Sequence, residues 1–202
     1  MPVLESSHLA EAVAFYGIIV CWWIFGLTFW LRKRPPAARE EKRDGVSLIG
    51  LALQAAAYFI VWRFPLQRAS FSFGGYTSAA ALWGLAFFAL ALAGVSVWLI
   101  NSAARHLGKQ WGLAARLVEG HALIQDGPYR FVRNPIYTGM FGMLLATGLA
   151  AGQWAPLLVA IVLFAIGTTI RIRVEERLLR QAFGTEFDDY ARRVPVLIPG
   201  IY

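Results

Sequence analysis

The chain has 202 residues, of which 58% are hydrophobic and 15% are charged, and its mean hydropathy is +0.54. Soluble domains are roughly 45–50% apolar and about 25% charged, so this composition excludes a water-soluble globular domain and a disordered tail protein. The net charge of +7 would suggest a nucleic-acid partner in a soluble protein. Here the basic residues lie between hydrophobic blocks, which instead predicts a lipid bilayer as partner and no nucleic acid.

Five apolar segments predict an all-α integral membrane protein, since a spanning helix needs about 20 mainly apolar residues. The predicted spans are residues 12–31, 46–62, 76–100, 136–151 and 154–171. The last two come from one uncharged stretch of 36 residues, Pro135–Ile170. At about 1.5 Å per residue it is too long for one crossing of a core about 30 Å thick. Gly148, Gly152 and Pro156 mark a turn inside it, so we expect a tight helical hairpin.

The positive charges predict how the chain is oriented. Five spans place 17 Lys and Arg residues on one side of the membrane, and only Arg63 and Arg68 on the other. Basic loops stay cytoplasmic, so the N-terminus is expected outside and the C-terminus in the cytosol. Residues 1–202 are expected to form a single membrane domain.

After the last span, Glu175–Arg193 is predicted to be a cytosolic amphipathic helix. The residues that suggest its apolar stripe are Leu178, Leu179, Ala182, Phe183 and Phe187. Gly184 weakens the middle of this helix. The lone cysteine, Cys21, excludes an intramolecular disulfide and a cysteine cluster for zinc, and no metal site is expected.

Polar residues that could take part in catalysis or binding gather on the side predicted to be cytosolic. The connection Asn101–Asn134 is too long for a simple turn. Asp126-Gly127-Pro128 predicts a turn inside it, and Pro135 suits the first position of a helix that Asn134 would cap. Arg171 and Glu175 are four residues apart and therefore share a helix face. A capped helix entry and a helix-end ion pair explain these residues as well as a binding site does.

Several of these motifs, in order, resemble the isoprenylcysteine carboxyl methyltransferase family. That family lies within a wider group of integral-membrane methyltransferases that includes phospholipid N-methyltransferases. The resemblance rests on His121–Gly139, Arg171-x-x-x-Glu175-Glu176, Phe183-Gly184, Tyr190 and Arg193–Pro199. It covers about residues 107–199, and a cofactor-binding part of about residues 105–199 is expected.

The resemblance implies S-adenosylmethionine (SAM) as methyl donor. The residues that it assigns to the cofactor are His121, Ala122, Leu123, Ile124, Tyr129, Asn134, Pro135, Ile136, Tyr137 and Glu175. Arg171 matches an arginine implicated in substrate binding or catalysis, and Tyr137 is expected to line the methyl-transfer region. Asn134 departs from the family, which usually has histidine there, so a role that needs a titratable imidazole is lost.

The favoured reaction is carboxyl O-methylation of an isoprenylcysteine-like amphiphile. An α-carboxylate, with a pKa of about 3.5, is already ionised at neutral pH, and the guanidinium of Arg171 could orient it. N-methylation of a phospholipid amine needs a base, and S-methylation of a small thiol needs less help; both remain open. More distant alternatives are an NADPH-dependent membrane reductase, whose C-terminal region is similar, and a non-enzymatic lipid-binding membrane protein.

Overall fold

The computed structural model describes residues 2–30, 40–43, 45–68, 78–110, 116–118, 122–152, 154–198 and 200. Within these ranges long helices dominate. The helices are α1 (Pro2–Trp30), α2 (Ser47–Arg68), α3 (Ala79–Leu107), α4 (Pro135–Ala151), α5 (Trp154–Phe183) and α6 (Thr185–Arg193). Shorter elements are the strands β1 (Glu40–Arg43) and β2 (Arg116–Val118) and the 3-10 helices η1 (Gly108–Gln110) and η2 (Gly127–Arg130).

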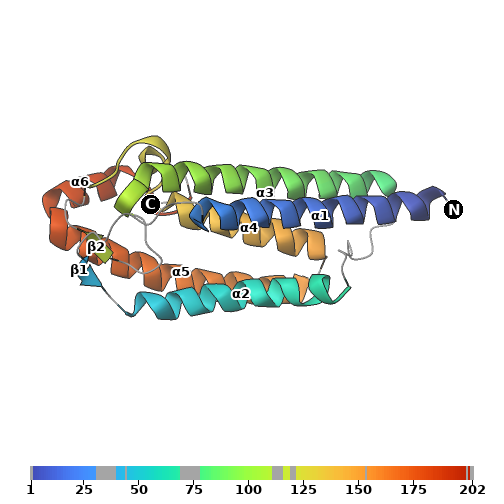
Figure 1. The fold of residues 1–202 in the computed structure, drawn as a ribbon, viewed down its shortest axis with the longest axis horizontal. Helices are drawn as coiled ribbons and strands as arrows, with labels where there is room; N and C mark the ends of the chain where they lie inside the picture. Colours follow the sequence, from blue (N-terminus) through green and yellow to red (C-terminus); the bar gives the residue numbers. More distant parts are fainter. Residues whose placement is uncertain are drawn as a thin grey trace.

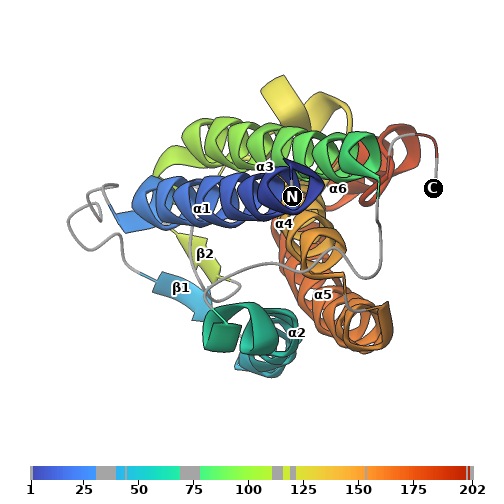
Figure 2. The same cartoon turned by 90° about the vertical axis from the view of Figure 1, so that its right-hand side faces the viewer.

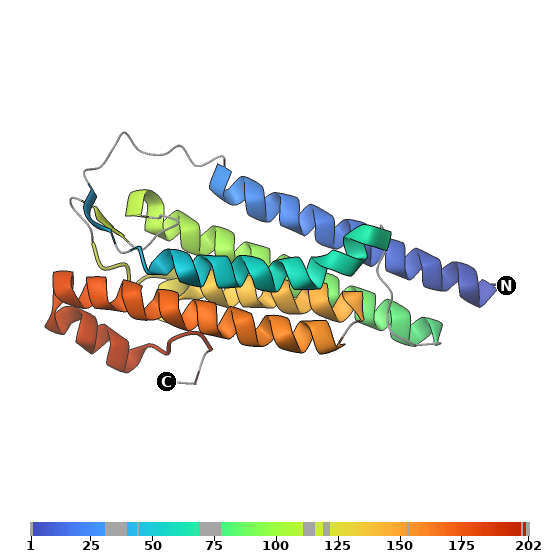
Figure 3. The same ribbon diagram turned by 90° about the horizontal axis from the view of Figure 1, so that it is seen from below.

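The long helices lie side by side along the molecule, as Figures 1 and 3 show. Helix α1 packs on α3, α2 packs on α5, and α4 contacts both of these pairs (Figure 2). Helix α4 therefore joins the two halves of the bundle.

The outer surface of the bundle is apolar. Phe87 of α3 is 76% exposed and Trp30 of α1 is 81% exposed, and exposed leucines, valines and isoleucines accompany them. Three helical segments are long and apolar enough to cross a bilayer, namely Leu9–Trp30, Ala79–Leu107 and Trp154–Phe183. The predicted class, a helical integral membrane protein, is confirmed. The apolar parts of α2 and α4, Ser47–Arg63 and Pro135–Ala151, are shorter, and the count of five spans stays a prediction.

Small residues let the helices approach closely, as is common inside membranes. A Cβ added to Gly50 of α2 would lie 2.5 Å from the carbonyl oxygen of Gly167 of α5, and one added to Gly167 would lie 2.6 Å from that of Gly50. A Cβ on Gly139 of α4 would likewise lie 2.8 Å from the carbonyl of Ser96 on α3. The α2–α5 crossing is therefore fixed at Gly50 and Gly167, beside the candidate site described below.

Two glycines with positive φ lie between the helices of the C-terminal half of the chain. Gly152 adopts a left-handed conformation (φ 65°) at the end of α4, so the long uncharged stretch folds into two helices as predicted. Gly184 has a φ of 53° and separates α5 from α6. The prediction of one amphipathic helix over Glu175–Arg193 was wrong in this respect: Glu175–Phe183 continues α5, and only Thr185–Arg193 forms a separate helix.

A small antiparallel ribbon joins two of the connections between helices. Strand β1 pairs with β2, with Arg43 opposite Arg116. The ribbon lies at the same end of the bundle as α6, whereas the N-terminus lies at the other end (Figure 1). The sequence of β1, Glu-Glu-Lys-Arg, shows no alternation of apolar and polar residues, which explains why no strand was expected. We call this end of the bundle the α6 end.

Candidate active site

A cavity of about 440 Å³ opens at the α6 end and reaches between α1, α2, α4 and α5. Most of the residues predicted for the site line it: Ala122, Leu123, Ile124, Tyr129, Asn134, Ile136, Tyr137, Arg171 and Glu175. Pro135 is fully buried at the start of α4 and is not among the lining residues. His121 lies outside the described residues. The structure thus brings residues 122–137 together with residues 171–175, which lie about forty residues further along the sequence. The role of both segments in cofactor binding stays a prediction.

A chain of hydrogen bonds connects Tyr137, Arg171 and Glu175 in the wall of this cavity. The Tyr137 hydroxyl donates to Glu175 Oε1 at 2.5 Å and accepts from Arg171 Nε at 2.7 Å. Arg171 Nη2 lies 3.8 Å from Glu175 Oε1. The guanidinium also lies over the Tyr137 ring, 5.3 Å from its centroid. The phenol therefore bridges the two charges and fixes both of them at the cavity.

The position of this chain of hydrogen bonds follows from the helix packing. Arg171 is 5% exposed, and a Cβ on Gly50 would lie 2.6 Å from its Cγ, so its stem crosses α2 where α2 has no side chain. Tyr137 lies in the first turn of α4, which begins at Pro135. A buried guanidinium is costly in an apolar bundle unless it is paired, and here Tyr137 and Glu175 supply partners.

The segment before α4 is tied to the C-terminal tail. The backbone N–H of Arg133 donates to Pro195 O at 2.8 Å, and that of Asn134 donates to Val196 O at 3.2 Å. The Asn134 side-chain amide also donates to Val196 O, at 3.1 Å. Asn134 does occupy the N-cap position of α4, but its side chain does not cap the helix because it binds the tail.

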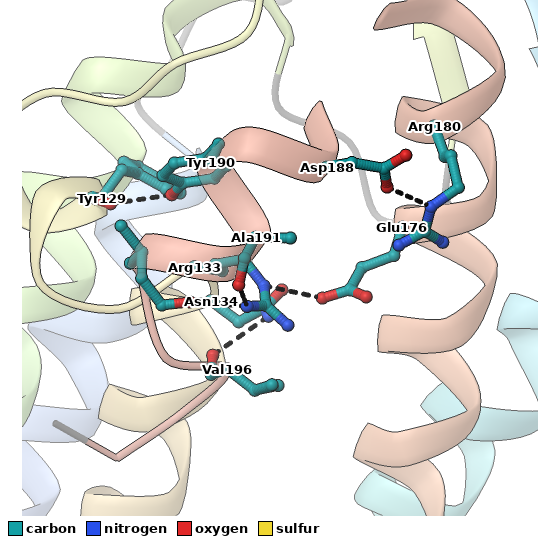
Figure 4. A network of polar contacts seen from close by, with 10 residues as sticks. Tyr129, Arg133, Asn134, Glu176, Arg180, Asp188, Tyr190, Ala191 and Val196 are labelled. Carbon is teal, nitrogen blue, oxygen red and sulfur yellow. Dashed lines mark hydrogen bonds and ion pairs between the residues drawn. The ribbon is translucent and has the colours of Figure 1, made fainter. Parts of the chain in front are cut away.

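Arg133 is a structural residue that the sequence analysis missed. Its Nη1 donates to Ala191 O at 2.6 Å and to Val194 O at 2.5 Å, and its Nε pairs with Glu176 at 2.9 Å (Figure 4). The carbonyls that Arg133 binds lie 58 and 61 residues further along the chain. The sequence around Arg133 therefore does not predict these partners. Arg133 thus fastens α5, α6 and the tail to the segment before α4.

Tyr190 of α6 completes this attachment. Its hydroxyl donates to Tyr129 O at 2.7 Å (Figure 4). Burial raises the pKa of Tyr190 to about 12, so the phenol stays protonated and keeps donating over the physiological pH range. Tyr129, a predicted cofactor residue, is therefore held by α6.

We expect Arg133→Gln to loosen this attachment. The change leaves Glu176 and two carbonyls without their cationic partner. The pair is part-buried, with side-chain exposures of 11% and 18%, so its loss should cost less than the roughly 3–5 kcal/mol typical of a fully buried pair. Thermal unfolding in detergent should shift to lower temperature, and protease should cleave the tail faster. Arg130→Gln is the matched control, because Arg130 is exposed and its guanidinium lies over the Phe131 ring rather than in the attachment of the tail. Equal stability of the two variants would contradict this role of Arg133.

A second cavity, of about 820 Å³, lies between α1 and α2. It shares Trp22, Ala55 and Tyr58 with the first cavity, and its lining is almost entirely apolar and aromatic. Trp22 Nε1 donates to Thr147 Oγ1 at 3.2 Å, and the Tyr58 hydroxyl donates to Met140 O at 2.8 Å. No function was predicted for α1 or α2 from the sequence, yet residues of both helices line both cavities.

The fold and the site together define a membrane-embedded helical protein with a buried charged site at the head of an apolar cavity. A family model described as phospholipid methyltransferase matches residues 84–186, half of the chain. The chain belongs to this family of integral-membrane methyltransferases, as its resemblance to the isoprenylcysteine carboxyl methyltransferases predicted.

Individual relatives carry different names. The protein-S-isoprenylcysteine O-methyltransferase of Schizosaccharomyces pombe is 32% identical over 140 residues, 68% of this chain and 55% of the relative. The cobalt-zinc-cadmium resistance protein CzcN of Cupriavidus metallidurans is 33% identical over 96 residues, 46% of this chain and 43% of the relative. The methanethiol S-methyltransferase of Mycobacterium tuberculosis is 30% identical over 182 residues, 85% of this chain and 68% of the relative. The chain thus spans only about half the length of the first two relatives.

Proposed function

We propose that this protein is a SAM-dependent membrane methyltransferase that methylates the carboxylate of an isoprenylcysteine-like amphiphile, with its site on the cytosolic side. The observation that carries the proposal is the buried arrangement of Arg171, Tyr137 and Glu175 at the head of an apolar cavity. A substrate with an anionic head and a lipid tail matches both parts of this cavity. The isoprenylcysteine methyltransferase among the relatives supports the same substrate class.

The residues at the α6 end fit SAM. Glu175 offers a carboxylate to the cationic ammonium or sulfonium, and Leu123, Ile124 and Tyr129 offer apolar and aromatic surface to an adenine ring. The backbone groups of Leu123 and Ile124 lie in a non-helical segment and are suited to hydrogen bonding with the ribose and base, whereas the Ala122 N–H donates to Gln110 Oε1 at 2.6 Å. SAM supplies an electrophilic methyl group when it is bound.

The chain's own residues provide alignment and charge placement. Arg171 would hold the substrate carboxylate, since a guanidinium matches a carboxylate with two parallel N–H groups. Tyr137 would keep Arg171 and Glu175 in fixed positions, so that substrate and donor meet in one geometry. Alignment alone can contribute about 7–11 kcal/mol to a two-substrate reaction. Because the nucleophile is anionic and the donor is cationic, an apolar surrounding favours their reaction, and no base is required.

The second cavity supports a sideways path for the lipid tail. It lies between α1 and α2 and shares the lining residues Trp22, Ala55 and Tyr58 with the first cavity. Trp23, Phe59 and Trp62 line it as well, and Trp23 and Phe59 are largely exposed on the outer surface of the bundle. A prenyl chain could therefore stay in contact with apolar surface from the bilayer to the site, while its carboxylate reaches Arg171.

A small thiol is the second candidate substrate. It is supported by the methanethiol S-methyltransferase of Mycobacterium tuberculosis, which matches 85% of this chain. A thiol with a pKa of about 8.5 needs little help to ionise, and an apolar cavity would admit it. A thiol, however, offers no carboxylate that a guanidinium could hold with two parallel N–H groups, and this favours the carboxylate.

The discriminating experiment uses the purified protein in lipid nanodiscs with methyl-labelled SAM. Acceptors offered in parallel are a farnesylated cysteine carboxylate, phosphatidylethanolamine and methanethiol. We expect labelled product from the farnesylated acid, with label that mild base releases as methanol, because only an ester is cleaved this way. Base-stable label on the lipid amine or the thiol, with none on the acid, would overturn the proposed substrate; no SAM binding would overturn the whole proposal.

A further inference from the structure

Gln110 is a polar residue at the cavity that no sequence motif singled out and that the proposed mechanism does not use. It ends the short helix η1, which follows α3 directly, and the positive φ of Gly108 (52°) ends α3 there. After this turn, Gln110 lines the cavity at the α6 end together with Leu107. Gln110 is half-buried, so its side chain is accessible to a ligand in the cavity.

The hydrogen bond to Ala122 fixes the orientation of the Gln110 amide. Gln110 Oε1 accepts from the backbone N–H of Ala122 at 2.6 Å. A backbone N–H can only donate, so its partner has to be the amide oxygen, and the opposite end of the amide is the NH₂ group. That group, Nε2, has two donors and no acceptor. A ligand that binds it must therefore offer an acceptor atom.

The position of Gln110 indicates which half of SAM it contacts. Its partner Ala122 begins the segment Ala122–Ile124, which together with Tyr129 is the proposed surface for the adenine ring. The adenine nitrogens and the ribose oxygens are acceptors on this side of the site. The methionine carboxylate is a further acceptor, but it shares a carbon with the ammonium group, and the residue proposed for that cation, Glu175, lies on α5.

We propose that Gln110 is a cofactor-binding residue whose Nε2 donates a hydrogen bond to an acceptor in the adenosine half of SAM. The inference rests on the proposed function and adds to its site a residue outside the recognised motifs. One side chain thus fixes the segment that faces the adenine ring and also contacts the cofactor. Because the bond to Ala122 already orders the amide in the free protein, little side-chain entropy is lost when SAM binds.

Gln110→Glu separates these two contacts. A glutamate oxygen still accepts from the Ala122 N–H, but the donor end becomes a second acceptor. The probe is methylthioadenosine, which has the adenosine half of SAM without its amino, carboxylate and sulfonium groups. We expect the affinity for this probe, measured by isothermal titration of the protein in nanodiscs, to fall about tenfold, which corresponds to about 1.4 kcal/mol. The affinity for S-adenosylhomocysteine should fall by a similar factor.

Gln125→Glu is the matched control. It makes the same change of charge in the same connection between α3 and α4, but Gln125 does not line the cavity, and its amide contacts Glu186. Its affinity for methylthioadenosine should stay within about twofold of the wild-type value. Thermal unfolding of ligand-free Gln110→Glu should match that of the wild-type protein, since the bond to Ala122 is kept. If Gln110 only positioned this segment, Gln110→Glu would bind the probe as the control does.

Three results overturn the inference. The first is a Gln110→Glu protein with wild-type affinity for methylthioadenosine; should that variant not fold, wild-type affinity in Gln110→Leu, which removes both contacts, has the same meaning. The second is a loss of affinity for S-adenosylhomocysteine alone, because it places the contact outside the adenosine half. In both cases SAM binding by the wild-type protein survives. The third is a wild-type protein that binds neither probe nor SAM, which removes the proposed function as well.

Discussion

Glu175→Gln is expected to weaken SAM binding by about 10- to 100-fold. The change removes one negative charge but keeps an oxygen that can accept from the Tyr137 hydroxyl, so the local packing is preserved. A hydrogen bond to a charged group contributes about 1.5–3 kcal/mol, and a factor of ten corresponds to about 1.4 kcal/mol. Isothermal titration of the purified protein with SAM measures this difference directly.

Glu186→Gln provides the control for Glu175→Gln. Glu186 lies at the same end of the bundle, in the first turn of α6, but it is exposed and does not line the cavity. Its loss should leave SAM affinity within about twofold of the wild-type value. If Glu175→Gln behaves like this control, Glu175 does not hold the donor, and the assignment of the cofactor to this end of the cavity fails.

Arg171→Lys is expected to lower kcat/KM for the farnesylated acid at least 100-fold. Lysine keeps the charge but lacks the planar group with which Arg171 reaches Tyr137 and Glu175 and could hold a carboxylate. A 100-fold loss corresponds to about 2.7 kcal/mol of transition-state stabilisation. SAM affinity should change by no more than about threefold, since Glu175 is retained.

Arg173→Lys tests whether the loss is specific. Arg173 is two residues away on α5 and is exposed, so the same change should leave the rate close to that of the wild-type protein. Initial rates of methyl ester formation at saturating SAM distinguish the two variants. An Arg171→Lys protein that keeps its rate, or that loses SAM binding as strongly as it loses rate, would show that Arg171 does not hold the substrate.

The fold was largely predictable because hydropathy reports directly on the membrane environment. Uncharged stretches of the sequence predicted the long helices, and the turn residues around Gly152 predicted the break between α4 and α5. The end of α5 was not predictable in the same way. Glu175–Phe183 has the composition of a separate surface helix, but nothing in its sequence stops α5 before Gly184, where the positive φ ends it.

The sequence predicted which residues form the candidate site, but not the hydrogen bonds that hold them in place. The motifs around Tyr137 and Glu175 are short and recognisable, and the structure places both residues in one cavity wall. Arg133 and Trp22 belong to no recognisable motif. Their roles depend on contacts with residues more than fifty positions away, which arise only when the helices pack.

The attachment of the C-terminal tail has a consequence for the order in which the protein is built. Arg133 and Asn134 find their acceptors on residues 191–196, which leave the ribosome after all the long helices. During synthesis, the segment that leads into α4 is therefore fixed only after residues 191–196 have been made. A nascent chain stalled before residue 191 would hold its helices in the bilayer while the loop carrying Tyr129 still lacked its anchor. Membrane insertion of the long helices therefore does not by itself assemble the pocket, which also needs the segment after α6.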